Sequence, residues 1–430
     1  MNKKQKSINW IPLFSTNFWG VLNDNFLKNL ICFVSILWVA ESHKSIVISI
    51  ATGMLVFPYI VFSPIASRLS QTKSKIKITR IFKFAEIPIM SLAVFGFYFE
   101  NLSLVLTALF FMGLQSTIMS PAKYGLIREI GGQDKISYGT GIIEMLIFLG
   151  VLLGTVVAGI ISEFENKNLI IAIIAISIAI IGYISSLFLK ANESAPLEKT
   201  DESLLFWNFL KNTYKKAKSY KGLNYVILCL ALFWLIGSLI QMTIIEHGPK
   251  YLKYNNTETS YLMALVAVSI AIGCVIAGIA SKKSIPILLV PIGIIGMFLC
   301  SLIICVFKPL GAGFIITIML LAFFAGLFQT PLNAWIQFNV KGRIVGEFIS
   351  YSNNVTFLFI LISAGIYAAL RTLFKDTHAV FVFITLLSFF TVFIIFLFIP
   401  KTYYRIKLII YIFILNKKNY KNKYLILKSK

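Results

Sequence analysis

The segment NLIIAIIAISIAIIGYISSLFL, from Asn168 to Leu189, contains no charged residue. An α-helix needs about 20 apolar residues to cross the hydrocarbon core of a bilayer, so this block is long enough to span one. Segments 284–307 and 377–400 are likewise free of Asp, Glu, Lys and Arg. Over all 430 residues, 58% are hydrophobic and 13% are charged, whereas soluble domains are about one quarter charged. We therefore expect a polytopic α-helical membrane protein with no room for a soluble catalytic domain.

Apolar blocks separated by charged or turn-rich breaks predict twelve spans in two sets of six. The first set lies near residues 10–40, 45–67, 81–98, 102–119, 137–161 and 168–189. The second set lies near residues 224–245, 261–281, 284–307, 311–330, 345–370 and 379–399. We expect an all-α protein with a six-helix bundle over 1–190, a basic cytoplasmic linker over 191–221, a second six-helix bundle over 222–400 and a basic cytoplasmic tail over 401–430.

The Lys and Arg residues fall mainly on one side of this topology. With both termini in the cytoplasm, cytoplasmic segments hold 32 of the 40 Lys and Arg and the opposite loops hold seven. Cytoplasmic loops are the ones enriched in cations, so both termini are expected inside. The net charge of +23 then reflects orientation and attraction to anionic inner-leaflet lipids. The cations are spread over seven segments, which argues against a nucleic-acid-binding face.

Cysteine and histidine usage does not favour a metal centre. The five Cys lie inside apolar blocks without a CxxC pair, and the chain has only three His. No metal, cofactor or catalytic residue is therefore expected. His247, which follows Glu246 at the outer end of the seventh predicted span, is expected to be solvated.

Four charged residues lie clearly within predicted spans: Asp24, Lys28, Glu86 and Glu144. A charge at the bilayer centre costs roughly 3 kcal/mol, so such residues usually face a wet cavity or a partner. Asp24 and Lys28 are four residues apart and lie on one helix face, which Asn17 extends by two turns. Two interpretations are open: an ion pair that only lets the helix insert, or a cavity-facing pair that binds a headgroup or a coupling cation. The second is favoured, because an inert pair could be replaced by apolar residues at lower cost.

The acids of the third and fifth predicted spans suggest different roles. Glu144 precedes Gly150-x-x-x-Gly154, a spacing that allows close helix packing, so we expect a polar pocket beside a tightly packed face. Glu86 could pair with Lys83 or Lys123 as an intracellular latch, and this is favoured over contact with a substrate.

Two similar polar runs end the fourth and tenth predicted spans. They are QSTIMSPAKY, residues 115–124, and QTPLNAWIQ, residues 329–337. Each places a proline, Pro121 or Pro331, near the cytoplasmic mouth. Paired helix interruptions at equivalent positions of two halves point to a transport site, although a duplicated packing kink would look the same.

These segments resemble the lysophospholipid transporter branch of the major facilitator superfamily, including the transporter module fused to acylglycerophosphoethanolamine acyltransferase and acyl-carrier-protein synthetase. The matching stretches are FWGVLNDNFLKN (18–29), KFAEIPIM (83–90), FMGLQSTIMSPAKYGLI (111–127), GIIEMLIFLGVLLGT (141–155), FWLIGS (233–238) and GLFQTPLNAWIQ (326–337). The resemblance implies inward flipping of a lysophosphatidylethanolamine-like lipid across the bacterial inner membrane for reacylation. It also implies that Asp24, Asn25, Lys123 and Glu144 are polar cavity or gating positions. With Lys28 and Asn17 they complete the predicted binding set.

The chain departs from the resembled proteins in two places. The loop SRLSQT (67–72) lacks the Gly and Asp of the usual superfamily motif, so its gating contact must differ or be weaker. Arg68, Glu86, Pro121 and Pro331 are the candidate gating residues. The tail beyond 401 lacks an HxxxxD acyltransferase motif, so any acyltransferase is a separate polypeptide or was lost from a fusion. Its short apolar segment 408–415 is expected to lie on the anionic inner leaflet.

Two other functions stay open at this point. The chain could carry another small amphiphile or drug, driven by a proton or sodium gradient. It could also be a non-transporting membrane anchor for an acyltransferase.

Overall fold

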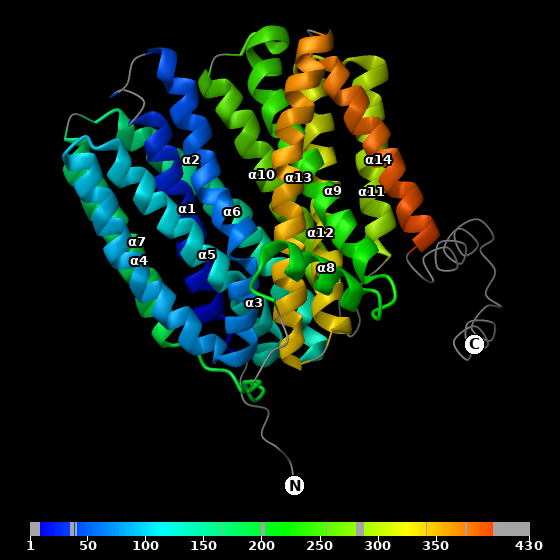
Figure 1. The fold of residues 1–430 in the computed structure, drawn as a ribbon. Helices are drawn as coiled ribbons and strands as arrows, with labels where there is room; N and C mark the ends of the chain where they lie inside the picture. The colour runs from blue at the N-terminus through cyan, green and yellow to red at the C-terminus, as the bar shows by residue number, and fades with distance from the viewer. Residues whose placement is uncertain are drawn as a thin grey trace, which may run out of the picture.

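The computed structural model describes residues 9–34, 38, 41–164, 166–198, 203–254, 256–280, 288–340, 342–374 and 376–398. Over these residues the secondary structure is entirely helical (Figure 1). The helices are α1 (Ile11–Phe33), α2 (Glu41–Val61), α3 (Ser63–Thr72), α4 (Lys75–Tyr98), α5 (Leu102–Gly131), α6 (Ile136–Ser162), α7 (Lys167–Leu187), α8 (Phe206–Ala217), α9 (Leu223–His247), α10 (Asn256–Ile279), α11 (Leu289–Phe307), α12 (Ala312–Asn339), α13 (Val345–Phe374) and α14 (His378–Phe398).

Ten helices in the described part of the chain are long and apolar enough to cross a membrane. The count rises to eleven if the bent pair Gly53–Val61 and Ser63–Thr72, which turns through 57°, is taken as one span. The remaining predicted span corresponds to α1, whose polar residues include Asn23, Asp24 and Lys28. The prediction of a membrane protein with many helices is thus confirmed. The second predicted span is bent rather than straight.

Helix boundaries differ from the predicted ones at three places. Pro64, in the first turn of α3, follows the break at Phe62, so the second predicted span is bent. Helix α5 runs on to Gly131, well past the predicted end at residue 119, and Gly132 ends it with a φ of 70°. The expected linker contains a helix, α8. The predicted tail helix lies outside the described residues.

The buried apolar residues form two large cores. One is built from α1, α2 and α4 to α7 and includes Phe26, Met90 and Leu109. The other is built from α8 to α14 and includes Phe314 and Phe348. In Figure 1 the blue-to-teal helices α1–α7 lie on one side and the green-to-red helices α9–α14 on the other. The exact domain boundaries at 190, 221 and 400 remain a prediction.

Glycines allow close backbone approach within and between the two groups of helices. A Cβ at Gly154 would lie 2.6 Å from the carbonyl oxygen of Leu22, so the predicted packing of the GxxxG face is confirmed and its partner is α1. A Cβ at Gly141 would lie 2.7 Å from the Cα of Gly278, where α6 meets α10. The two groups of helices are therefore in direct backbone contact at one end of α6.

Candidate functional site

A buried ion pair lies where α1, α4 and α5 meet. Lys83 Nζ is 2.5 Å from Glu86 Oε2, and both side chains are fully buried. Asn23 Nδ2 donates to Glu86 Oε1 at 2.6 Å, and Gln115 Nε2 donates to Glu86 Oε2 at 3.1 Å. The predicted pairing of Glu86 with Lys83 is confirmed. Lys83, Asn23 and Gln115 all belong to the first group of helices, so their contacts with Glu86 stabilise that group. The gating role of Glu86 stays a prediction.

Asp24 lies beside this network on the same helix α1. Its Oδ2 accepts a 2.6 Å hydrogen bond from Ser116 Oγ on α5. Its Oδ1 is buried and has no hydrogen-bond partner in the part of the chain that the structure describes. An unsatisfied buried acceptor costs about 1–3 kcal/mol. The free oxygen is therefore a natural attachment point for a positively charged or hydrogen-donating ligand.

Asp24 and Lys28 do not form an ion pair. Among the described residues, Lys28 makes neither a hydrogen bond nor an ion pair, and Asp24 bonds to Ser116 instead. The interpretation of an ion pair that only aids insertion is therefore wrong. Both side chains are only partly exposed.

The other two predicted α1 residues are placed differently. Asn25 Nδ2 donates to the carbonyl of Val21 on its own helix at 2.9 Å. Asn17 is buried, and its Nδ2 has no partner within the described residues. Asn17 therefore keeps a free donor, whereas Asn25 is bonded to the backbone.

Glu144 connects the two groups of helices. Its Oε1 accepts from Tyr124 Oη at 2.7 Å and from Asn333 Nδ2 at 3.0 Å, and its Oε2 accepts from Gln329 Nε2 at 2.9 Å. One turn towards the start of α6, Thr140 accepts from Gln337 at 3.0 Å. The two polar runs of the sequence thus converge on one carboxylate that is 1% exposed. Lys123 lies next to it, with Nζ 5.0 Å from the centre of the Tyr124 ring.

The two prolines do not interrupt their helices. Pro121 and Pro331 are buried inside the continuous helices α5 and α12, so the predicted interruptions are wrong. A proline inside a helix lacks the N–H that would bond the carbonyl four residues earlier. The carbonyls of Thr117 and Leu327 therefore lose that helical donor, and any gating role of the prolines remains a prediction.

An apolar cavity of about 800 Å³, open on its outer side, lies between α2, α5 and α13. Its lining includes Met54 and Phe57 on α2, Phe110 on α5 and Leu361 on α13. Beside it, Asn354 Nδ2 donates to the carbonyl of Ile60, another lining residue, at 2.8 Å. The cavity is therefore lined by residues of both groups of helices and lies beside a hydrogen bond that connects them.

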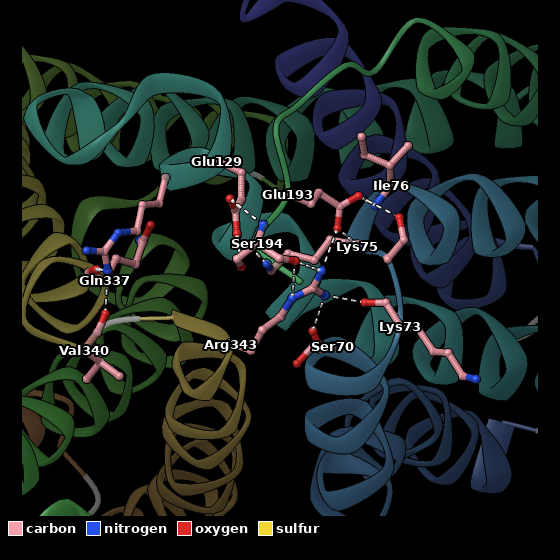
Figure 2. Close-up of polar contacts among 12 residues, drawn as sticks. Ser70, Lys73, Lys75, Ile76, Glu129, Glu193, Ser194, Gln337, Val340 and Arg343 are labelled. Carbon is pink, nitrogen blue, oxygen red and sulfur yellow. Dashed lines mark hydrogen bonds and ion pairs between the residues drawn. The ribbon is translucent and has the colours of Figure 1, made fainter. Parts of the chain in front are cut away.

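Arg343, just before α13, forms a cluster with four residues of the other group of helices and its trailing linker (Figure 2). Its Nε donates to the carbonyl of Ser194 at 3.0 Å, and its Nη1 donates to the carbonyls of Ser70, at 3.2 Å, and Lys73. Its Nη2 lies 3.4 Å from Glu193 Oε2. These residues, Arg343, Ser70, Lys73, Glu193 and Ser194, are called the Arg343 cluster below. Arg343 is only 4% exposed.

The Arg343 cluster is supported by neighbouring contacts at the same end of the molecule. Glu193 accepts from the Ser74 hydroxyl and from the backbone N–H of Lys75, both at 2.6 Å, and so caps the start of α4. Glu129 binds Lys75 at 2.8 Å and accepts from the Ser194 hydroxyl at 2.8 Å (Figure 2). Arg128 Nη1 donates to the carbonyls of Gln337 and Val340, at 3.2 and 2.7 Å.

Arg68 does not take part in this cluster. Its side chain is exposed and makes no hydrogen bond or ion pair with the residues that the structure describes, so its predicted gating role lacks support. The sequence did not reveal Arg343, because a cation in a short loop is expected from orientation alone and its main partners are backbone carbonyls.

The opposite end of the molecule has a separate polar group on α9 and α13. Arg371 and the Tyr367 hydroxyl bind the carboxylate of Glu246, the latter at 2.8 Å. His247 is 1% exposed, stacks on Phe314 and lies 2.8 Å from the Thr377 hydroxyl. The expectation of a solvated His247 is therefore wrong. Within the described residues, no group of three or more His, Cys, Asp or Glu side chains is placed to hold a metal ion.

The sequence profile of the Major Facilitator Superfamily matches residues 18–366. The chain belongs to this superfamily. Lysophospholipid transporter LplT of Photorhabdus laumondii is 26% identical over 60% of this major facilitator chain, and the alignment covers 64% of that relative. The corresponding proteins of Escherichia fergusonii and Enterobacter sp. are 26% and 23% identical over 72% and 83% of the chain, and 76% and 89% of their own lengths.

Solved major facilitator structures share the fold. The human organic anion transporter MFSD10 superposes with a TM-score of 0.71 at 13% identity, covering 89% of this chain and 98% of that one. The E. coli fucose:proton symporter FucP superposes with a TM-score of 0.70 at 12% identity, covering 89% and 96%. The resemblance to the lysophospholipid transporter branch is confirmed by the relatives. With ten or eleven apolar helices in its described segments and with bacterial relatives, the chain is a multi-pass protein of the bacterial inner membrane.

Proposed function

We propose that this chain is a secondary transporter that moves lysophospholipid to the cytoplasmic leaflet by alternating access, so that the lipid can be reacylated there. The superfamily match and the lysophospholipid transporters among its relatives support this substrate class. A lysolipid carries a charged headgroup and one acyl chain. It therefore needs polar groups for the head and an apolar cavity for the tail. The polar groups lie on α1, α5 and α6, and the cavity lies between α2, α5 and α13.

The observation that carries the proposal is the unsatisfied Oδ1 of Asp24. A carboxylate with one oxygen held by Ser116 and one oxygen free is fixed in place and can still accept from an ammonium group. Lys123, beside Glu144, supplies a positive charge for the headgroup phosphate, and Lys28 offers a second one. Charged hydrogen bonds of this kind are worth about 1.5–3 kcal/mol each, which is enough to orient a zwitterionic head.

The apolar cavity between α2, α5 and α13 suits the acyl chain. Its lining residues include Met54, Phe57, Phe110 and Leu361. Sites for small ligands typically enclose about 300–1,000 Å³ with mainly apolar walls, and the cavity has a volume of about 800 Å³. Burying each CH₂ of the chain contributes about 0.8 kcal/mol. Most of the affinity would therefore come from the tail, and the orientation from the head.

The proposed topology places the Arg343 cluster at the cytoplasmic end. Counting α1 and the bent pair α2–α3 together with the ten apolar helices gives twelve spans. An even number puts both termini on the same side, and the distribution of Lys and Arg favours the cytoplasm. The chain itself has no enzymatic role in this proposal, and reacylation falls to a separate acyltransferase.

The test is uptake of fluorescent lysophosphatidylethanolamine into proteoliposomes that contain the Asp24→Asn variant. The substitution removes the negative charge but keeps the shape, so we expect uptake to fall by about tenfold or more, in line with the loss of one charged hydrogen bond. Asp134→Asn is the matched control, because Asp134 is exposed between α5 and α6. The control should transport normally.

Normal uptake by Asp24→Asn would remove Asp24 from the mechanism. If the wild-type protein moves no lysolipid but exports an unrelated amphiphile, the substrate class is wrong. If the purified protein moves nothing while its deletion still abolishes reacylation in cells, the chain acts as an anchor and transport is excluded.

A further inference from the structure

Helix α8, in the linker between the two groups of helices, carries one exposed stripe of aromatic and basic residues. Trp207, Lys211, Tyr214 and Lys218 are spaced i, i+4, i+7 and i+11, so they share a helix face. All four are exposed, Trp207 to 75%. Phe209, Thr213 and Ala217 form the buried face. Basic and aromatic residues on a single amphipathic face are typical of a helix that lies in a membrane interface.

The buried side of α8 is attached to α13. Thr213 Oγ1 and Lys216 Nζ donate to Glu347 Oε1 at 3.1 and 3.0 Å, and Glu347 is 2% exposed. This contact fixes the rotation of α8 about its axis. The stripe with Trp207 and Lys218 is therefore held outward in a defined direction.

A pocket of about 370 Å³ lies between the stripe and the start of α9. Tyr214, Lys218, Tyr220 and Asn224 give it polar groups, and Ile227 and Val355 give it an apolar part. Lys218 Nζ is 4.9 Å from the centre of the Tyr214 ring, so the cation is at the pocket. Asn224 Oδ1 is buried and has no partner within the described residues.

This set of groups selects one kind of ligand. A lysine cation and phenol hydroxyls bind a phosphodiester, and an unsatisfied amide oxygen needs a hydrogen donor such as a headgroup hydroxyl. The apolar part of the pocket and the exposed Leu204 and Leu205 before α8 favour a lipid over a free phosphate ester, because they offer contact for acyl chains.

We propose that this pocket binds the headgroup of an anionic phospholipid with hydroxyl donors, of which phosphatidylglycerol is the simplest. The site is distinct from the proposed transport site, because its lining residues lie on α8, α9, α13 and the 218–222 turn, and none of them lines the cavity between α2, α5 and α13. Whether or not the chain transports lysolipid, this binding can be measured on its own.

The experiment measures equilibrium binding of dioctanoyl phosphatidylglycerol and dioctanoyl phosphatidylcholine to the purified full chain in detergent, by native mass spectrometry. We expect phosphatidylglycerol to bind roughly tenfold more tightly, because each interfacial lysine contributes about 1 kcal/mol towards an anionic lipid. Lys218→Gln should weaken phosphatidylglycerol binding by about fivefold. Lys215→Gln is the matched control, since Lys215 is exposed on the same helix but does not line the pocket, and it should change binding by less than about twofold.

Several results would overturn the proposal. Equal binding of the two lipids would remove the preference for an anion. Equal losses in Lys218→Gln and Lys215→Gln would show that only the overall charge matters. Displacement of the lipid by glycerol phosphate at the same concentration would identify a site for a free phosphate ester.

Discussion

The two ends of the molecule hold their arginines in different ways. At the Arg343 end, the guanidinium donates to backbone carbonyls of Ser70, Lys73 and Ser194, which belong to the other group of helices and its linker. At the opposite end, Arg371 binds Glu246, and both residues lie within the second group. The first arrangement joins the two groups, whereas the second stabilises one of them.

This difference indicates which end is closed and how it can open. Glu144 with Gln329, Arg128 with Val340, and Arg343 with its cluster all connect the two groups from the middle of the molecule towards one end. Backbone carbonyls remain where the helices place them whatever the side chains are, so an arginine can leave and rebind the same acceptors. The contacts at this end are therefore suited to a gate, and the Glu246 contact is suited to a fixed structure.

The largest expected effect is that of Arg343→Ala. It removes several charged hydrogen bonds, each worth about 1.5–3 kcal/mol, so we expect the open form at this end to gain about a hundredfold in population. The measurement is the distance between spin labels at Asp134→Cys and Asn339→Cys, two exposed positions in different groups, by double electron–electron resonance.

Arg80→Ala is the matched control for Arg343→Ala. Arg80 also donates to backbone carbonyls, those of Leu187 and Leu189 at 3.0 and 3.1 Å, but within the first group of helices. It should leave the label distances unchanged. If both variants lengthen the distances equally, the Arg343 cluster is not the contact that closes this end.

A smaller effect is expected for Gly346→Ala at the start of α13. A Cβ there would lie 3.0 Å from the Cβ of Ser70 and closer still to its hydroxyl oxygen, so α13 and α3 must separate slightly. Overpacking of this kind costs about 1–3 kcal/mol, which should raise the open population about tenfold. Gly365→Ala on the same helix is the control, because a Cβ at Gly365 meets nothing within 4 Å. Identical label distances in the two variants would show that the helix contact tolerates a methyl group.

The smallest effect is expected for Arg371→Ala at the opposite end. Its ion pair is partly exposed, so the free energy of unfolding should fall by no more than about 1 kcal/mol. Thermal unfolding of the purified protein measures this loss. The label distances should stay as in the wild type, and adding Arg371→Ala to Arg343→Ala should open the gate no further. A longer distance in Arg371→Ala alone would mean that both ends control the same motion.

Site residues were easiest to predict from the sequence where a charged side chain lies inside an apolar segment. The sequence predicts Lys83 as one of two partners for Glu86 and a polar pocket beside Glu144, because an uncompensated acid in a membrane span is costly. The polar runs around Pro121 and Pro331 were placed at equivalent positions, and they meet at Glu144. Charged and polar residues inside a long apolar segment are therefore easy to identify from the sequence alone.

The sequence predicted least where the partner was a backbone group or a neighbouring helix. Arg343 binds carbonyls, which every residue possesses, so no side-chain pattern points to it. The i, i+4 spacing of Asp24 and Lys28 permits a pair, but Ser116 on α5 takes the carboxylate oxygen. A signal for α8 was available: Phe209, Thr213 and Ala217 recur every four residues, as the buried face of a helix requires.

Glu144 has a consequence for the separation of the two groups of helices. Two of its three donors, Gln329 and Asn333, come from α12, and they leave together when α12 moves away from α6. A carboxylate kept from water with only the Tyr124 hydroxyl is costly, so water or a proton has to take the place of the lost donors. The carboxylate that joins the two groups of helices is therefore also the residue that makes their separation costly.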